Sequence, residues 1–140
     1  MNDWLFDNIN NGVYKATFAR SKEAYWDAYN SFYAAMDILE KRLEDKRFLF
    51  GDYVTDSDVR LYVTLARLDI RYAFQLGHTK QRLIDYKNLW GYARDLYQIP
   101  AFKNNTYFKD FANPSNKKAG HLMETFNARF LDEINFDAYW

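Results

Sequence analysis

One stretch, FLFGDYVTDSDVRLYVTLARLDIRY at positions 48–72, restricts the possible folds of this chain more than any other. Its Gly51-Asp52-Tyr53 start predicts a tight loop, and Thr55 then stands where a helix N-cap belongs. The Thr55 hydroxyl can accept a hydrogen bond from a first-turn backbone N–H. Asp58, three residues on, can reach back to the Thr55 amide as in a capping box, and its charge suits the positive end of the helix dipole. The pattern therefore predicts a helix that begins just after Thr55.

The predicted helix is apolar on nearly every side. Val54 and Val59 fall at the positions of a hydrophobic staple, which would fix the angle at which the chain enters the helix. A helix with little polar surface is usually buried, so we expect it to be the central strut of an all-α domain. Its polar residues recur at helical spacing as one narrow stripe: Arg60, Thr64, Arg67 and Arg71.

The rest of the chain also favours helices, and its 140 residues fit one domain. Met1–Ile9 is interpreted as the end of a helix, which suggests a truncated chain, and Asn10-Asn11-Gly12 as its stop signal. Ser21 can cap an amphipathic helix that runs to about Asp45. Further helices are expected over 88–98, capped by Asn88, from about Pro100, and over 122–134 after the loop at 113–118.

Composition excludes several classes of function. Nineteen basic and nineteen acidic residues balance to a formal net charge of +0, which gives no general attraction to nucleic acid or to an anionic membrane. No apolar run has the length of a membrane span, and the first residues lack the pattern of a signal peptide, so we expect a cytoplasmic protein. The absence of cysteine excludes disulfides, thiolate metal sites and a cysteine nucleophile within these residues.

Few residues suggest catalysis. The chain has no Glu-x-x-His pair, and His121 and Glu124 on one helix face are only two ligands, too few for a metal site. His78 and His121 are therefore best interpreted as surface residues. Arg60, Arg67 and Arg71 could form a basic strip for an anion, but pairing with acidic residues on adjacent helices is favoured. Asp58 is assigned to capping rather than to acid–base chemistry.

Tyr14 is the most promising polar group. It follows the predicted helix stop, so it should sit at the mouth of a cleft where helices diverge. A phenol there could donate a hydrogen bond to a ligand oxygen. The alternative is a ring packed against Trp4 with its hydroxyl in water. Tyr72, at the far end of the central helix, has the same two interpretations.

Several motifs together resemble the C-terminal domain of glutathionyl-hydroquinone reductases, the xi-class or omega-like glutathione transferases. The Thr55-x-x-Asp58 helix start is general to glutathione transferases, whereas the segments around Tyr14 and Trp90 are more specific. The similarity covers most of the chain up to about Phe108. Its segments are NNGVYK at 10–15, FA at 18–19, EAY at 23–25, LFGD at 49–52, TDSDVRL at 55–61, TLARLD at 64–69, DYKNLWGY at 85–92 and RDLYQIP at 94–100.

The resemblance implies a two-domain parent enzyme, with residues 1–140 as its α-helical C-terminal domain. A thioredoxin-like N-terminal domain would bind glutathione as co-substrate and carry a catalytic cysteine, which would remove glutathione from glutathionyl-hydroquinones through a mixed disulfide. The helical domain would supply the wall of a hydrophobic, quinone-type pocket and part of a homodimer interface. Tyr14 matches a family tyrosine that points into the active site, and Tyr72 matches a second tyrosine.

Two departures from the family pattern matter. The thioredoxin-like domain and its cysteine are absent from these residues, so this chain alone is expected to bind no cofactor and to be inactive. After Phe108 the sequence diverges, and Ser115 lies near the place of a further family tyrosine. The alternative hypothesis is a stand-alone, non-enzymatic module with the same fold that binds a protein or an apolar ligand.

Overall fold

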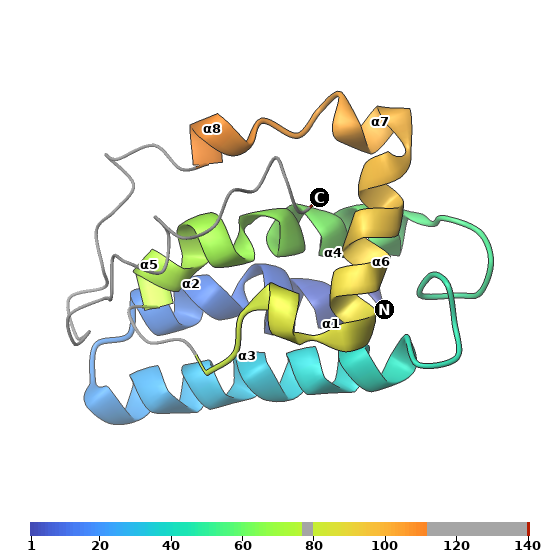
Figure 1. Ribbon diagram of the computed structural model, residues 1–140. Helices are drawn as coiled ribbons and strands as arrows, with labels where there is room; N and C mark the ends of the chain where they lie inside the picture. The colour runs from blue at the N-terminus through green and yellow to red at the C-terminus, as the bar shows by residue number, and fades with distance from the viewer. Residues whose placement is uncertain (77–79, 112–139) are drawn as a thin grey trace.

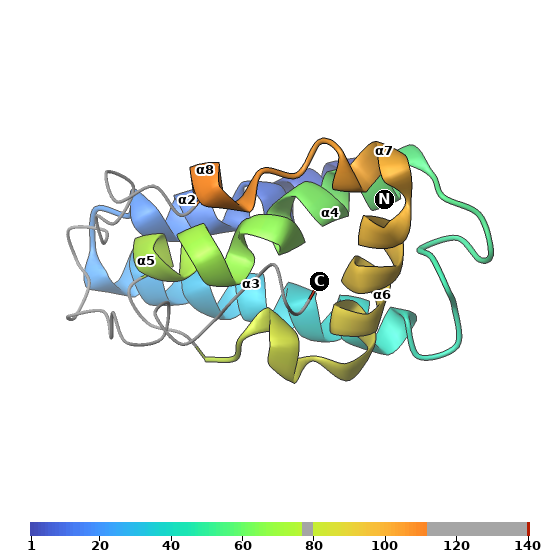
Figure 2. The same ribbon diagram turned by 45° about the horizontal axis from the view of Figure 1, so that its top comes forward.

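The computed structural model describes residues 1–76, 80–111 and 140. Within these residues all regular elements are helical, apart from one isolated bridge between Phe48 and Gly51, so the predicted all-α fold is confirmed. Three helical rods lie side by side, and α6 runs across them (Figures 1 and 2). The rods are α1 (Asn2–Leu5), η1 (Phe6–Asn10) and α2 (Gly12–Thr17); α3 (Lys22–Arg42); and α4 (Asp56–Arg67), η2 (Leu68–Tyr72) and α5 (Ala73–Leu76).

The prediction that Asn10-Asn11-Gly12 stops a helix is wrong. The π-helical segment η1 ends at Asn10, Asn11 keeps right-handed angles (φ −92°, ψ −12°), and α2 starts at once. These residues instead join two rods: the Asn10 side chain donates to the Arg60 carbonyl at 2.8 Å and to the Thr64 hydroxyl at 2.7 Å. Gly12 permits close approach to α3, since a Cβ there would lie 3.1 Å from the Phe32 ring.

The α3 rod begins as predicted, because the Ser21 hydroxyl accepts a hydrogen bond from the Ala24 amide at 3.1 Å. It ends at Arg42, a few residues before the predicted Asp45. Its buried face follows the expected steps of three and four residues and packs against α2. The buried residues of this face are Tyr25, Tyr29, Phe32, Tyr33, Ala35, Met36 and Leu39.

Asp58 joins three parts of the fold. In the predicted capping box, its Oδ2 accepts from the Thr55 amide and the Thr55 hydroxyl, both at 2.7 Å. Its Oδ1 accepts from the Leu49 amide and the Tyr92 hydroxyl, both at 2.9 Å. The Asp58 side chain is fully buried, so its carboxylate loses its hydrogen bonds to water. These donors replace those hydrogen bonds. The loop that Leu49 belongs to turns at Gly51, whose φ of +126° favours glycine.

The α4 helix is less enclosed than its apolar sequence predicts. Val59 and Val63 are 44% and 42% exposed, and Val54 is exposed as well. Thr64, which was assigned to the polar stripe, is buried, and its hydroxyl accepts a hydrogen bond from the Asn10 side chain. The core-facing side is therefore narrower than expected, and includes Leu61, Leu65 and Ala66.

The second half of the described chain closes the core from the side. After η3 (Leu83–Asp85), α6 (Lys87–Gln98) begins one residue before Asn88, so Asn88 is not its N-cap. The first turn of α6 is instead bound by Glu40 of α3, whose carboxylate accepts from the Asn88 amide at 2.8 Å and the Leu89 amide at 2.7 Å. The predicted helix start at Pro100 is confirmed by α7 (Pro100–Lys103), and α8 (Phe108–Phe111) follows.

Some predictions lie outside the described residues. These are the helix over 122–134, the surface placement of His78 and His121, and the role of Ser115. Within the described part of the chain, no helix is both long and apolar enough to cross a membrane.

Candidate functional site

Tyr14 and Tyr72 come together between the first and third rods. Their hydroxyl oxygens lie 3.4 Å apart, within hydrogen-bond range, and either one can be the donor. The rings meet edge to face, with centroids 5.9 Å apart and planes at 75°. The two tyrosines that the sequence singled out separately thus form one hydroxyl pair. The alternative in which Tyr14 packs on Trp4 is replaced by packing on Tyr72.

Both tyrosines are placed by helices that contain a π-helical segment. Tyr72 is the last residue of η2, and Tyr14 lies in α2, directly after η1. An extra residue in a helical turn shifts the side chains that follow around the helix axis, and such segments occur often at functional sites. Tyr14 therefore lies within a helix, and not in the open crossing that its sequence context predicted.

Contacts on both sides hold the pair in register. The Thr17 hydroxyl donates to the Val13 carbonyl at 2.8 Å and reaches the Gln75 carbonyl at 3.5 Å, which links α2 to α5. The Tyr25 hydroxyl donates to the Leu76 carbonyl at 3.0 Å and ties α5 to α3. These bonds fix the position of the rod that carries Tyr72 relative to the rod that carries Tyr14.

The two hydroxyls have different environments. Burial, followed by the neighbouring Tyr14 hydroxyl, raises the pKa of Tyr72 above its usual value, while Arg67 and Arg71 lower it to a smaller extent. Tyr72 is therefore a neutral phenol near neutral pH. It is 6% exposed, whereas Tyr14 is only half-buried. The buried hydroxyl can support the more accessible one, which is the group that a ligand would meet first.

Phe18 extends this site to the surface, although the sequence motifs assigned it no role beyond its place in the family pattern. Its ring stacks on the Tyr14 ring, with centroids 6.5 Å apart and planes at 9°, and it is 70% exposed. The spacing of four residues from Tyr14 would have revealed the pair if a helix had been predicted there. Together Tyr14, Tyr72 and Phe18 form an aromatic site with two hydroxyls, which suits a flat ligand that carries an oxygen.

Nucleophilic and metal chemistry have no support among the described side chains. The sequence contains no cysteine, and the described residues hold no cluster of three or more potential metal ligands. The expected pairing with acidic residues of adjacent helices is wrong for Arg60, and the described contacts of Arg67 are of other kinds. Arg60 pairs with Asp56 of its own helix at 2.7 Å, and Arg67 donates to the Val63 carbonyl and lies 4.1 Å over the Phe111 ring.

A comparison with protein families decides the fold family. The profile of the family "Glutathione S-transferase, C-terminal domain" matches residues 16–95. The chain belongs to the glutathione S-transferase C-terminal domain family. The resemblance seen in the sequence motifs is thereby confirmed, and Tyr72 lies within the matched residues whereas Tyr14 lies just before them.

Relatives of this glutathione S-transferase domain are xi-class and omega-like enzymes. The glutathionyl-hydroquinone reductase YqjG of Escherichia coli K12 is 41% identical over 113 residues, which are 81% of this chain and 34% of YqjG. The reductase PcpF of Sphingobium chlorophenolicum is 37% identical over 89 residues, or 64% of this chain and 28% of PcpF. The chain therefore spans about a third of the length of the curated relatives it matches.

Solved structures of related transferases share the helical fold of this chain. The glutathione-bound structure of YqjG matches with a TM-score of 0.77 and 40% identity, over 82% of this chain and 37% of that one. The Xi glutathione S-transferase of Phanerochaete chrysosporium matches with a TM-score of 0.76 and 38% identity, over 82% and 39% of the two chains. The helical arrangement described here is thus that of the C-terminal domain of xi-class transferases.

Proposed function

We propose that this domain forms the aromatic substrate wall of a glutathionyl-hydroquinone reductase, with Tyr14 and Tyr72 as the groups that orient the substrate oxygen. The carrying observation is the 3.4 Å contact between the two hydroxyls at the edge of an exposed aromatic surface. In this proposal the buried Tyr72 hydroxyl donates to the Tyr14 oxygen. The Tyr14 hydroxyl is then left to donate to a phenolic oxygen of the substrate.

The covalent chemistry is assigned to a different domain of the same protein. A thioredoxin-like domain would bind glutathione, and its cysteine thiolate would attack the sulfur that links glutathione to the hydroquinone ring. The ring carbon takes up a proton as the carbon–sulfur bond breaks, and a mixed disulfide forms. A second glutathione then releases glutathione disulfide. These 140 residues contain no cysteine, so the chain alone should have no such activity.

Binding of benzene-1,4-diol tests the role of Tyr14 in this chain. We expect Tyr14→Phe to weaken binding by roughly five- to tenfold, because one hydrogen bond to the ligand is worth about 1 kcal/mol. The measurement is an NMR titration that follows the Tyr72 ring resonances, which wild type and both variants share. Tyr53→Phe is the matched control, since Tyr53 is 65% exposed and lies outside the pair.

Two results would contradict the proposal. Equal binding of benzene-1,4-diol by Tyr14→Phe and Tyr53→Phe would show that the Tyr14 hydroxyl does not bind this ligand. Turnover of a glutathionyl-hydroquinone by the 140-residue chain would show that the covalent chemistry does not need a thioredoxin-like domain. The coding sequence upstream of Met1 supplies a further test: a Cys-Pro motif in a thioredoxin-like domain supports the enzyme, and a stand-alone gene supports a binding module.

Homodimer formation and a cytoplasmic location remain predictions. Exposed apolar side chains on several elements provide surface for self-association, among them Phe6 at 55% and Ile38 at 57% exposure. Light scattering over a range of protein concentrations would show whether this chain dimerises without a second domain.

A further inference from the structure

A second aromatic site lies between α4 and α6 and is made of other residues than the tyrosine pair. Four rings from three elements surround the indole of Trp140: Tyr62 of α4, Trp90 and Tyr97 of α6, and Phe108 of α8. We call these four residues the aromatic cup. The C mark lies between α4 and α6 in the view of Figure 2. Tyr62 and Tyr72 are ten residues apart, or about 15 Å along a helix.

The ring geometry is that of a receptor for a flat aromatic group. The Trp140 ring lies 5.0 Å from Trp90 at 83°, 5.8 Å from Tyr97 at 67°, and 6.1 Å from Tyr62 at 83°. The Phe108 ring is 5.2 Å away at 39°. Edge-to-face contacts at these distances are the preferred aromatic arrangement. The indole is therefore held from several sides at once.

The contacts described between Trp140 and the rest of the chain are all between aromatic rings. Its indole Nε1 is buried and has no hydrogen-bond partner among the described residues. A buried donor without an acceptor weakens the fit of an indole to its site. The cup thus matches the shape of Trp140 without satisfying its N–H, and an aromatic group that lacks this donor would fit at least as well.

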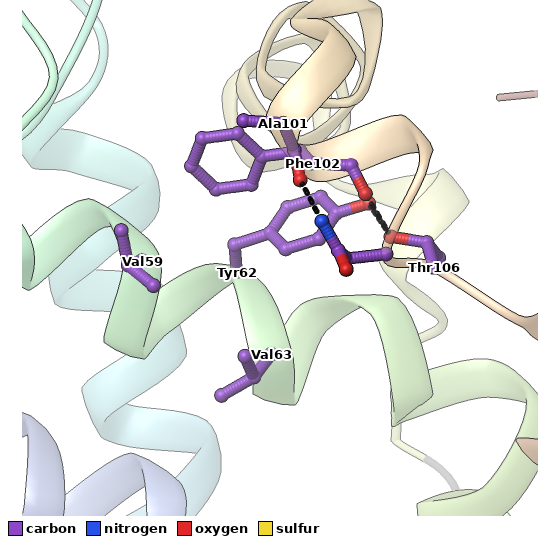
Figure 3. Close-up of a pocket in the computed structure, with 7 residues that line it drawn as sticks. Val59, Tyr62, Val63, Ala101, Phe102 and Thr106 are labelled. Atoms are coloured by element: carbon purple, nitrogen blue, oxygen red, sulfur yellow. Dashed lines mark hydrogen bonds between the residues drawn. The ribbon is translucent and has the colours of Figure 1, made fainter.

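The walls of the cup are held by other contacts. The Tyr62 hydroxyl bonds to the Thr106 hydroxyl at 2.9 Å, and its ring meets Phe102 edge to face at 4.9 Å. Figure 3 shows Tyr62 below Phe102, beside an open pocket of about 250 Å³ that Val59 and Val63 also line. Tyr62 therefore belongs both to the cup and to the lining of this pocket.

We propose that the aromatic cup is a binding site for planar, neutral or anionic aromatic molecules, and that Trp140 occupies it as an internal ligand. Positive charges beside the cup disfavour cations: the Arg94 guanidinium lies 5.7 Å from the Trp90 ring centre, and the Lys103 ammonium 5.5 Å from that of Tyr97. An external aromatic molecule would compete with Trp140 for the same four rings. The site is separate from the tyrosine pair, so it stands or falls independently of the proposed reductase function.

Indole is the probe for this proposal. We expect Trp140→Ala to bind indole at least tenfold more tightly than the wild-type chain, with a shift of the Trp90 indole resonance, because the cup has been emptied. 1-Methylindole should bind Trp140→Ala at least as well as indole, since the cup offers the N–H no acceptor. Trp26→Phe is the matched control, because Trp26 packs against Tyr25 and Tyr29 of α3.

Circular dichroism covers the case in which Trp140→Ala closes up or unfolds. Two indoles 5.0 Å apart should give an exciton couplet in the far-ultraviolet spectrum. Trp140→Phe and Trp90→Phe should each remove that couplet, and Trp26→Phe should retain it. A couplet that survives Trp140→Phe, or a folded Trp140→Ala chain that binds indole no better than wild type, would overturn the proposal.

Discussion

At the scale of single residues, Asp69 is the group whose charge is hardest to accommodate. It lies in η2 and is 4% exposed; its Oδ1 accepts from the Leu83 amide at 2.7 Å, whereas its Oδ2 is buried without a partner. Burial raises the pKa of Asp69 from its usual 3.8 to about 6, although the Leu83 and Ile84 amides lower it. Because the folded pKa is the higher one, the native state binds more protons between these values. Ionisation of Asp69 therefore costs stability as pH rises from about 4 to 6.

The pH dependence of unfolding tests this assignment. Lowering the pH from 7 to 5 should add about 1 kcal/mol to the unfolding free energy through Asp69, and Asp69→Asn should lack this gain. Ion-paired carboxyls such as Asp56 and Asp95 have lowered pKa values, so their contributions are lost only at pH values below this window. Urea unfolding of both chains at pH 5 and pH 7 gives the comparison. Equal pH slopes for the two chains would show that Asp69 is not the group responsible.

At the scale of helices, α6 depends on a residue of α3 for its first turn. Two α6 amides donate to the Glu40 carboxylate, whose negative charge also favours the positive end of the α6 dipole. Glu40→Ala should therefore cost about 2 kcal/mol of unfolding free energy. It should also speed hydrogen exchange at the Asn88 and Leu89 amides. Glu44→Ala, at an exposed position just after α3, is the control, and an equal loss in both variants would contradict the capping role.

Helix starts that rest on local chemistry were predictable, and those that rest on distant residues were not. Ser21, Thr55 and Pro100 each mark a helix start through contacts or backbone limits within a few residues. Asn88 looked like a cap, but the acceptor for the first turn of α6 comes from α3. The Asn10-Asn11-Gly12 run looked like a stop because local propensity gives no sign that Asn10 bonds to α4.

The candidate site also has a part that the sequence predicted and a part that depends on contacts between distant residues. Tyr14 and Tyr72 were found individually, through their positions and their match to family motifs. Their contact joins residues that are 58 positions apart, and the π-helical segments that bring them into register have no signal in hydrophobic periodicity. The role of Phe18 was missed for the same reason, because the segment that carries it was not predicted to be helical. Sequence motifs thus named the residues, and the packing of the rods made them a site.

At the scale of the whole molecule, the described residues share one core, which bears on whether this domain folds on its own. The buried apolar residues form one continuous cluster that runs from Leu5 in α1 to Phe108 in α8. Exposed apolar side chains such as Phe18 and Ile38 lie on different elements. A single core that every rod shares should unfold as one unit. We therefore expect one cooperative urea transition, with the same midpoint by tryptophan fluorescence and by far-ultraviolet circular dichroism.

A core substitution makes this expectation stricter. Leu61 is fully buried in α4, so Leu61→Ala should lower the unfolding free energy by about 2–5 kcal/mol and shift both spectroscopic midpoints by the same amount. Val63→Ala, in the same helix but 42% exposed, should cost much less. If folding instead required the proposed thioredoxin-like domain, the chain would bind a hydrophobic dye at neutral pH and the two midpoints would differ. That result would mean that the chain needs contacts with a second domain in order to fold fully.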